Sequence, residues 1–106
     1  MAKYMVKGSY TSEGAKGLLK EGGSGRRAAV EKSLSGMGGK IEAFYYALGD
    51  DDVYVIVDVP DVASVLALSM AVNASGAVRI TTTPLVSAED IDAAGKKTVG
   101  YRAPGQ

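Results

Sequence analysis

Hydrophobic and polar positions alternate most clearly in residues 40–60, a pattern that predicts two strands joined by a tight turn. Residues 40–48 (KIEAFYYAL) and 53–59 (VYVIVDV) are rich in aromatic and β-branched residues. The glycine and three aspartates between them form the turn, and Pro60 ends the second strand. Valine recurs at every second position of the second strand, which places these β-branched side chains on one face. The centre of the chain therefore predicts an antiparallel hairpin.

The chain before the hairpin predicts one strand and two helices. Residues 3–10 (KYMVKGSY) alternate as a strand, and Thr11 and Ser12 offer an N-cap to a short helix. A second helix is predicted over residues 26–37, where apolar side chains recur at helical spacing and Ser24 is the expected N-cap. The glycine pair that follows is expected to end this helix.

The chain after the hairpin predicts a helix, a strand and a shorter helix. Asp61 is the expected N-cap of a helix through about Ala74, which is apolar almost all round and is therefore expected to be largely buried. Residues 77–84 (AVRITTTP) form the last predicted strand. Residues 87–90 (SAED) resemble a capping box, with aspartate in place of the usual glutamate, and open a helix through about Val99.

The element order β-α-β-β-α-β plus a C-terminal helix predicts an α+β protein with a ferredoxin-like, four-stranded antiparallel sheet. Right-handed crossovers place the main helices on one face of that sheet. The length of 106 residues is that of one domain, which we assign to residues 1–100, with residues 101–106 as a loose tail. The other face of the sheet then meets water, a ligand or a partner.

The second face of the predicted sheet is not uniformly polar. Strict alternation sorts the first hairpin strand into two sets, Ile41, Ala43, Tyr45 and Ala47 on one face and Glu42, Phe44, Tyr46 and Leu48 on the other. In the next strand Tyr54, Ile56 and Asp58 lie opposite the valines. A sheet with one solvated face alternates more cleanly with polar residues, so this mixture predicts an interface. We therefore expect a homodimer or higher homo-oligomer that associates through sheet faces.

Composition excludes several kinds of chemistry and partner. The chain has no histidine and no cysteine, which removes the commonest general base and metal ligand as well as disulfides and thiolate nucleophiles. Twelve basic and twelve acidic residues cancel, and no basic stripe with aromatics predicts a nucleic-acid surface. No apolar run is long enough to span a bilayer and no signal peptide is recognised, so we expect a cytoplasmic protein without membrane contact. We expect neither a metal nor a cofactor.

The charges are nevertheless unevenly distributed along the chain. Residues 1–40 hold eight basic and three acidic residues, a net charge of +5. Residues 41–95 hold nine acidic residues and a single basic one, Arg79, a net charge of −8. Such a split either orients one subunit against another or describes two differently charged, solvated surfaces.

Five segments and one motif are typical of a single protein family. The segments are residues 4–11 (YMVKGSYT), 17–23 (GLLKEGG), 39–45 (GKIEAFY), 55–58 (VIVD) and 71–79 (AVNASGAVR). Gly49 and Asp52 fit a Gly-Asp-Tyr-Asp motif in which Asp51 stands in place of the tyrosine. In these positions the chain resembles the GYD-domain family of small bacterial and archaeal proteins. The resemblance implies a fold of the dimeric α+β-barrel type and self-association, and it assigns no biochemical role.

Aromatic and charged residues near the hairpin are candidates for a ligand site. The tyrosines at positions 4, 10, 45, 46 and 54 either line a pocket for an aromatic molecule or pack in the core and an interface. The ligand-binding candidates are Tyr46, Tyr54, Asp52, Asp58 and Arg79. Arg79 is expected either to pair with Asp58 or Glu42 across the sheet or to hold a ligand carboxylate.

Two further segments offer ionic chemistry. Residues 20–27 (KEGGSGRR) are either an anion-binding loop, with Ser24, Arg26 and Arg27 as its binding residues, or a flexible connection between helices. The segment lacks the Gly-Lys-Ser/Thr ending of a P-loop. The three aspartates at 50–52 have no EF-hand spacing, and we interpret them as a solvated turn rather than a metal site.

Two functional interpretations follow. The leading one is a non-catalytic assembly or small-ligand-binding module. The alternative is a cofactor-free enzyme of the small monooxygenase or isomerase kind, in which Asp52, Asp58 or Glu42 is a base with a pKa raised by burial. An enclosed cavity with one desolvated carboxylate near Tyr46 or Tyr54 would favour the enzyme.

Overall fold

The computed structural model describes residues 2–106 as four strands and four helices. Met1, which belongs to the predicted domain of residues 1–100, lies outside the described residues. In chain order the elements are β1 (Ala2–Tyr10), α1 (Ser12–Glu21), α2 (Gly23–Ser35), β2 (Lys40–Tyr46), β3 (Val53–Val59), α3 (Val62–Ala74), β4 (Val78–Leu85) and α4 (Ala88–Gly95). Every predicted element is therefore present, with ends that differ by a few residues.

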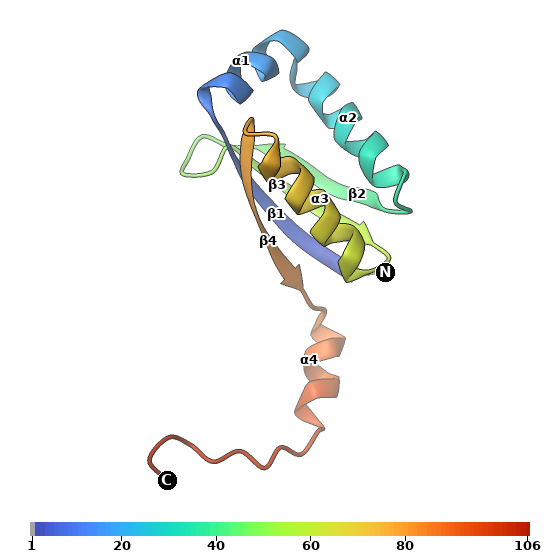
Figure 1. Ribbon diagram of the computed structural model, residues 1–106. Helices are drawn as coiled ribbons and strands as arrows, with labels where there is room; N and C mark the ends of the chain where they lie inside the picture. The colour runs from blue at the N-terminus through green and yellow to red at the C-terminus, as the bar shows by residue number, and fades with distance from the viewer. Residues whose placement is uncertain (1) are drawn as a thin grey trace.

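The strands form one antiparallel sheet in the order β2-β3-β1-β4, and α1, α2 and α3 lie on one of its faces (Figure 1). This is the ferredoxin-like α+β arrangement that the sequence predicts, so the fold class is confirmed. The central strand β3 pairs with β1 over its whole length, from Val59 opposite Ala2 to Val53 opposite Gly8. We call the face covered by these helices the helix face and the opposite one the open face.

Side-chain caps start three of the four helices at the predicted residues. Thr11 accepts a hydrogen bond from the backbone N–H of Gly14 at 3.2 Å, at the start of α1. Asp61 accepts one from the first turn of α3 at 2.7 Å, and Ser87 forms the predicted capping box with Asp90 at α4. These helix starts are therefore encoded by the local sequence.

The second helix begins earlier than predicted, and Ser24 does not cap it. α1 ends at Gly22, whose φ of +86° favours glycine, and α2 begins at the next residue. Gly22 is thus the C-cap of α1 and the N-cap of α2 at once, and no side chain caps α2. Ser24 lies inside the first turn because one left-handed glycine is enough to redirect the chain.

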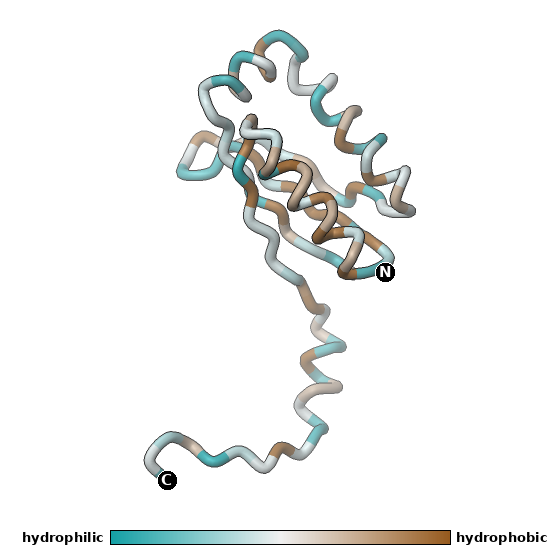
Figure 2. Tube along the Cα trace, in the orientation of Figure 1, coloured by the Kyte–Doolittle hydropathy of each residue, from teal (hydrophilic) through white to brown (hydrophobic). Residues whose placement is uncertain are grey.

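The core is the layer between the helix face and the helices. The alternating valines of β3 are buried together with Tyr4 and Val6 of β1, and Leu34 of α2 and Val65 of α3 pack against this layer. Figure 2 shows the same concentration of hydrophobic residues in the central strands and α3. Burial of this apolar surface is the main stabilising contribution of the fold.

The third helix is less buried than its apolar composition predicts. Val65 is its only buried residue, whereas Val62, Leu66 and Met70 are 60%, 55% and 71% exposed. The expectation of a largely buried helix is therefore wrong. The reason is geometric: α3 packs on β3 and β4 through one side, and no other element of residues 2–106 covers its outer side.

A β-bulge in β2 changes which of its side chains face the helices. The register with β3 shifts between Ile41 and Ala43, so Glu42 is the extra residue. Beyond the bulge, Phe44 and Tyr46 pair with valines of β3 and so share the helix face with Ile41. The strict alternation predicted for this strand is therefore wrong, because one inserted residue moves every following side chain to the other face.

The C-terminal segment projects away from the sheet (Figure 1). α4 and the tail after it lie beyond the end of β4, and all their residues are exposed. The radius of gyration is accordingly 17.0 Å, compared with about 13 Å for a compact chain of this length. Across residues 2–106, no helix is long and apolar enough to cross a bilayer.

Candidate functional site

A cleft lies on the helix face between α2 and α3. α2 packs on β2, whereas α3 packs on β3 and β4, so a gap remains between the two helices over the central strands. The cleft has a volume of about 780 Å³, within the range of small-molecule sites. Val30 of α2 and Leu68 and Val72 of α3 line its sides. Its floor is formed by sheet residues, among them Val6, Val53, Val55, Val57, Val78 and Ile80.

Polar groups line the cleft beside α1 and the start of α2. They include Tyr10, Glu13, Glu21 and Arg26. Arg26 and Glu21 form an ion pair with 3.6 Å between Nη1 and Oε1. Burial, followed by the neighbouring Tyr46, raises the pKa of Tyr10 to about 12. The Tyr10 hydroxyl is therefore protonated at neutral pH and can donate a hydrogen bond.

Tyr46 fixes the start of α2 over the sheet. Its hydroxyl donates to the carbonyl of Gly23 at 3.0 Å, and its ring lies edge-on to Phe44 with centroids 5.3 Å apart. A Cβ at Gly23 would lie only 3.1 Å from that ring. Burial raises the pKa of Tyr46 as well. These contacts set the position of one wall of the cleft.

The acidic residues of the cleft are solvated. Glu13 and Glu21, its two carboxylates, are exposed. Asp58 is the one buried charged residue among residues 2–106, and it lies on the open face. The cleft can therefore surround an apolar molecule and offer hydroxyl and guanidinium donors to a polar end. None of its lining residues is a desolvated base.

The open face carries a charged cluster at one end. Lys3 forms ion pairs with Glu42 and with Asp58, the latter at 3.5 Å, and these neighbours raise the pKa of Lys3. Asp58 is 8% exposed, and within residues 2–106 its Oδ1 has no hydrogen-bond partner. The expected pairing of Arg79 with Asp58 or Glu42 is wrong. Arg79 lies opposite Ser9, about 20 Å along β1 from Lys3, because each strand residue advances about 3.3 Å.

Asp52 links the hairpin turn to the end of β1 by two hydrogen bonds. Its backbone N–H donates to the carbonyl of Gly8 at 2.8 Å, and its carboxylate accepts from the backbone N–H of Tyr10 at 2.9 Å. Asp51 accepts from the Ser9 hydroxyl at 3.3 Å. In the described part of the chain, no group of three acidic or other metal-ligating side chains is placed to hold a metal ion.

The structure divides the predicted ligand-binding residues among separate places. Tyr54, Asp58 and Arg79 lie on the open face, where β1 separates the first two from Arg79. Tyr46 lies on the helix face and Asp52 in the turn. No single pocket therefore contains all five residues.

The predicted anion-binding residues are also separated. Arg26 lines the cleft, whereas Arg27 pairs with Glu31 at 3.1 Å and Ser24 is exposed. The sequence predicts that the β3 valines of the cleft floor lie on one face of the sheet, and it does not predict that this floor borders a cleft. One signal was present in the sequence: α2 has only Val30 and Leu34 as large apolar residues, too few to cover two strands.

Comparison with known proteins identifies the family. The GYD domain profile matches residues 4–94 of the 106-residue chain. The comparison with curated proteins gives no match, and neither does the comparison with solved structures. The matched segment runs from Tyr4 in β1 into α4, so it includes the sheet except for the first two residues of β1, and it includes the cleft. The chain therefore belongs to the GYD-domain family.

Proposed function

We propose that this GYD-domain protein is a homo-oligomeric, non-catalytic module that binds a small, largely apolar molecule between its sheet and its helices. The cleft of about 780 Å³ is the observation that carries the proposal. A domain with a purely structural role fills such a space with side chains, because protein interiors are close-packed. An apolar ligand would cover the partly buried apolar residues of the lining, among them Val30, Leu68 and Ile80, and so bind favourably.

The lining residues indicate the chemistry of the ligand. Most of the cleft is apolar, so most of the ligand has to be apolar as well. The donors lie beside α1 and the start of α2, where the Tyr10 hydroxyl and the Arg26 guanidinium line the cleft. We therefore expect an aromatic or alicyclic molecule with one hydrogen-bond acceptor, such as a carbonyl or a carboxylate.

The positions of the acidic residues support binding rather than catalysis. A cofactor-free enzyme of the kind considered above needs a base with a raised pKa close to its substrate. The carboxylates of the cleft, Glu13 and Glu21, are exposed, and Asp58 is separated from the cleft by the sheet itself. Phenol hydroxyls that stay protonated at neutral pH suit the recognition of an acceptor.

The open face supports self-association. Met5, Tyr54 and Ile56 are half-buried neighbours at its centre, although no helix covers them. We therefore propose that the open face is the interface between copies.

Native mass spectrometry of protein purified without a denaturing step tests both parts of the proposal. We expect an intact oligomer that carries a reproducible extra mass of small-molecule size. A neutral apolar fluorescent probe, N-phenyl-1-naphthylamine, is then added to protein from which the bound small molecule has been removed. Its fluorescence measures binding to the cleft. We expect the probe to bind and the natural ligand to displace it.

Two alanine-to-phenylalanine variants of α3 provide a matched comparison, because only one of them fills the cleft. Ala71 lines the cleft from α3, whereas Ala63 is exposed on the same helix and does not line it. Ala71→Phe should abolish probe binding and Ala63→Phe should leave it unchanged. Equal binding by both variants would show that the probe occupies another surface and would refute the ligand site. A bare monomer would refute self-association.

A further inference from the structure

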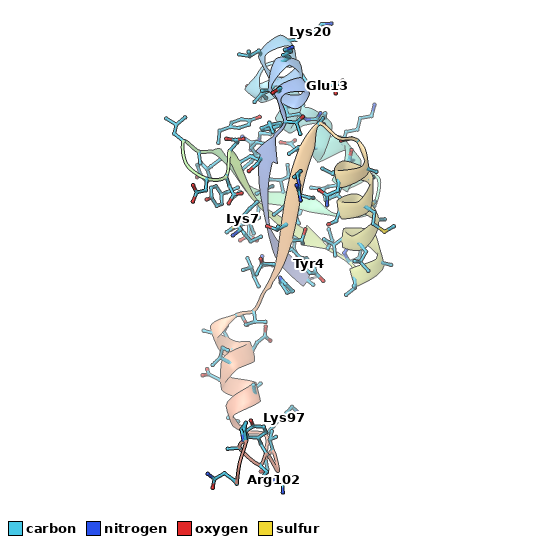
Figure 3. All side chains as sticks on the ribbon, turned by 60° about the vertical axis from the view of Figure 1, so that its left-hand side comes forward. Tyr4, Lys7, Glu13, Lys20, Lys97 and Arg102 are labelled. Atoms are coloured by element: carbon cyan, nitrogen blue, oxygen red, sulfur yellow. The ribbon has the colours of Figure 1, made fainter. Side chains whose placement is uncertain are left out.

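One side of α1 faces the cleft, and Gly17 lies at the centre of that side. The residues of α1 that line the cleft recur at intervals of three and four positions, the spacing of one helix side: Glu13, Gly14, Gly17, Leu18, Lys20 and Glu21. Glu13 and Lys20, both labelled in Figure 3, lie about one turn before and one turn after Gly17, on the helix beyond the end of the sheet. Ala15 and Leu19 are exposed and do not line the cleft. Gly17 therefore faces the cleft.

Glycine is an unfavourable residue at this position. Gly17 is the sixth of the ten residues of α1, so it lies inside the helix and not at a cap. Glycine destabilises a helix interior relative to alanine, because it loses more backbone freedom on folding. A helix as short as α1 is only marginally stable by itself, so this loss is large for it. The position needs a reason for the missing side chain.

Neighbouring glycines have structural reasons that Gly17 lacks. A Cβ at Gly14 would lie 1.8 Å from the carbonyl oxygen of Ala77, and Gly22 has a φ of +86°. Gly17 does not have a positive φ, and a Cβ there would meet no atom within 4 Å. Neither backbone conformation nor packing within the chain therefore requires glycine. The missing side chain leaves open space on the cleft side of α1.

Small residues from two other segments line the cleft beside this space. Ala77 contacts α1 directly, because its carbonyl accepts from the backbone N–H of Thr11 at 3.0 Å. Its own backbone N–H donates to the hydroxyl of Ser75 at 3.2 Å. Ser75 and Ala77 both line the cleft, and so does Ala71, one turn before Ser75 at the end of α3. The space at Gly17 thus belongs to a part of the cleft that short side chains surround.

The part of a ligand that fills this space has to be apolar. Helix hydrogen bonds already engage the backbone N–H and C=O of Gly17, which lies inside α1. Leu18 beside it adds apolar surface to the lining. Glu13 and Lys20 are exposed, so their charged groups stay in water. A methylene chain or the edge of a ring makes dispersion contacts here and leaves no polar group without a partner.

We infer that the cleft takes an elongated ligand whose apolar end lies against the backbone of α1 at Gly17, and that this glycine sets the greatest ligand length that fits. The inference rests on the proposed small-molecule site and adds the shape of its ligand. Glycine allows a ligand to approach the backbone more closely than any other residue does. The lower stability of the helix follows from keeping this space open.

Competition between N-phenyl-1-naphthylamine and 4-alkylphenols of increasing chain length tests the inference. Each added methylene should raise the affinity about fourfold until the cleft is filled. Gly17→Phe should shorten the longest chain that still gains affinity, whereas the shorter alkylphenols should bind this variant and the wild type alike. Ala15→Phe is the matched control, because Ala15 is exposed and lies about 200° around the helix from Gly17. It should keep the wild-type limit.

Gly17→Ala separates a role in the ligand site from a role in folding. Alanine fits the helix better, so this variant should unfold at a higher urea concentration than the wild type. It also removes room for about one methylene, so its affinity for the longest accepted alkylphenol should fall about fourfold. Higher stability with unchanged affinity would overturn the inference. This comparison also tests the inference if Gly17→Phe does not fold.

Failure of the inference and failure of the proposed site give different results. Equal chain-length limits for Gly17→Phe and the wild type would overturn the role of Gly17. The ligand site itself would stand if Ala71→Phe still abolished probe binding. A wild-type protein that binds neither the probe nor any alkylphenol would overturn both.

Discussion

Gly14 is a position where helix propensity and tertiary structure predict opposite effects of the same substitution. In an exposed helix, replacing glycine by alanine stabilises by about 1 kcal/mol, because glycine loses more backbone freedom on folding. Gly14 is buried, however, and a Cβ there would lie 1.8 Å from the carbonyl oxygen of Ala77. Real Cβ atoms essentially never approach closer than 3.0 Å, so the two must separate by at least 1.2 Å (3.0 − 1.8).

The contacts around Ala77 set the size of the effect. Its carbonyl accepts from the backbone N–H of Thr11 at 3.0 Å and from the Thr11 hydroxyl at 3.2 Å. Moving this oxygen loses about one hydrogen bond, worth about 1 kcal/mol. Overpacking adds a cost of about 1–3 kcal/mol. After subtracting the helix-propensity gain, Gly14→Ala should lower the free energy of unfolding by about 1–3 kcal/mol.

Urea denaturation followed by circular dichroism measures this change. Gly17→Ala is the matched control, because Gly17 is on the same helix and a Cβ there would have nothing within 4 Å. We expect Gly17→Ala to stabilise the protein by about 0.5–1 kcal/mol. The close packing of α1 on the loop before β4 would be refuted if both variants changed the free energy of unfolding in the same direction. A Gly14→Ala variant as stable as the wild type would refute it as well.

Three further predictions concern single side chains. Leu34→Ala should cost about 2–5 kcal/mol in urea denaturation because Leu34 is fully buried, whereas Leu19→Ala should change stability by less than about 0.5 kcal/mol. Tyr10 keeps its proton to a pKa of about 12, so its contribution to stability is complete below about pH 10 and is lost as the pH rises to about 12. Tyr10→Phe should therefore remove the phenol that ionises near pH 12 in an ultraviolet titration and flatten the alkaline loss of stability. The Ser64 backbone N–H lowers the pKa of Asp61, so Asp61→Ala should destabilise at neutral pH and the difference should shrink as the pH falls through that pKa.

The amino-acid sequence by itself determined the order of the elements and the starts of three helices. Thr11, Asp61 and Ser87 cap their helices as predicted, because capping depends on hydrogen bonds over three residues. The valines of β3 lie on one face as predicted, because side chains alternate along any regular strand. Such features depend on near neighbours in the chain, so a local pattern encodes them.

The candidate site was predictable only in part. Tyr10 and Arg26 were among the residues considered, yet the separation of Tyr46 from Tyr54, Asp58 and Arg79 was not foreseen. The bulge at Glu42 moves Tyr46 to the helix face, and the pairing of β1 with β4 places Arg79 opposite Ser9. Both results depend on how strands pair, which involves residues far apart in the sequence.

Only the tertiary structure decided that a cleft exists and that α4 stands free. The same apolar residues could have formed a closed core if α2 and α3 had met over β1 and β3. The helices stay apart because α2 packs on β2 through Leu34 and α3 packs on β3 and β4 through Val65. The space between two helices is set by where each one packs on the sheet, a distance that hydrophobic periodicity within either helix does not contain.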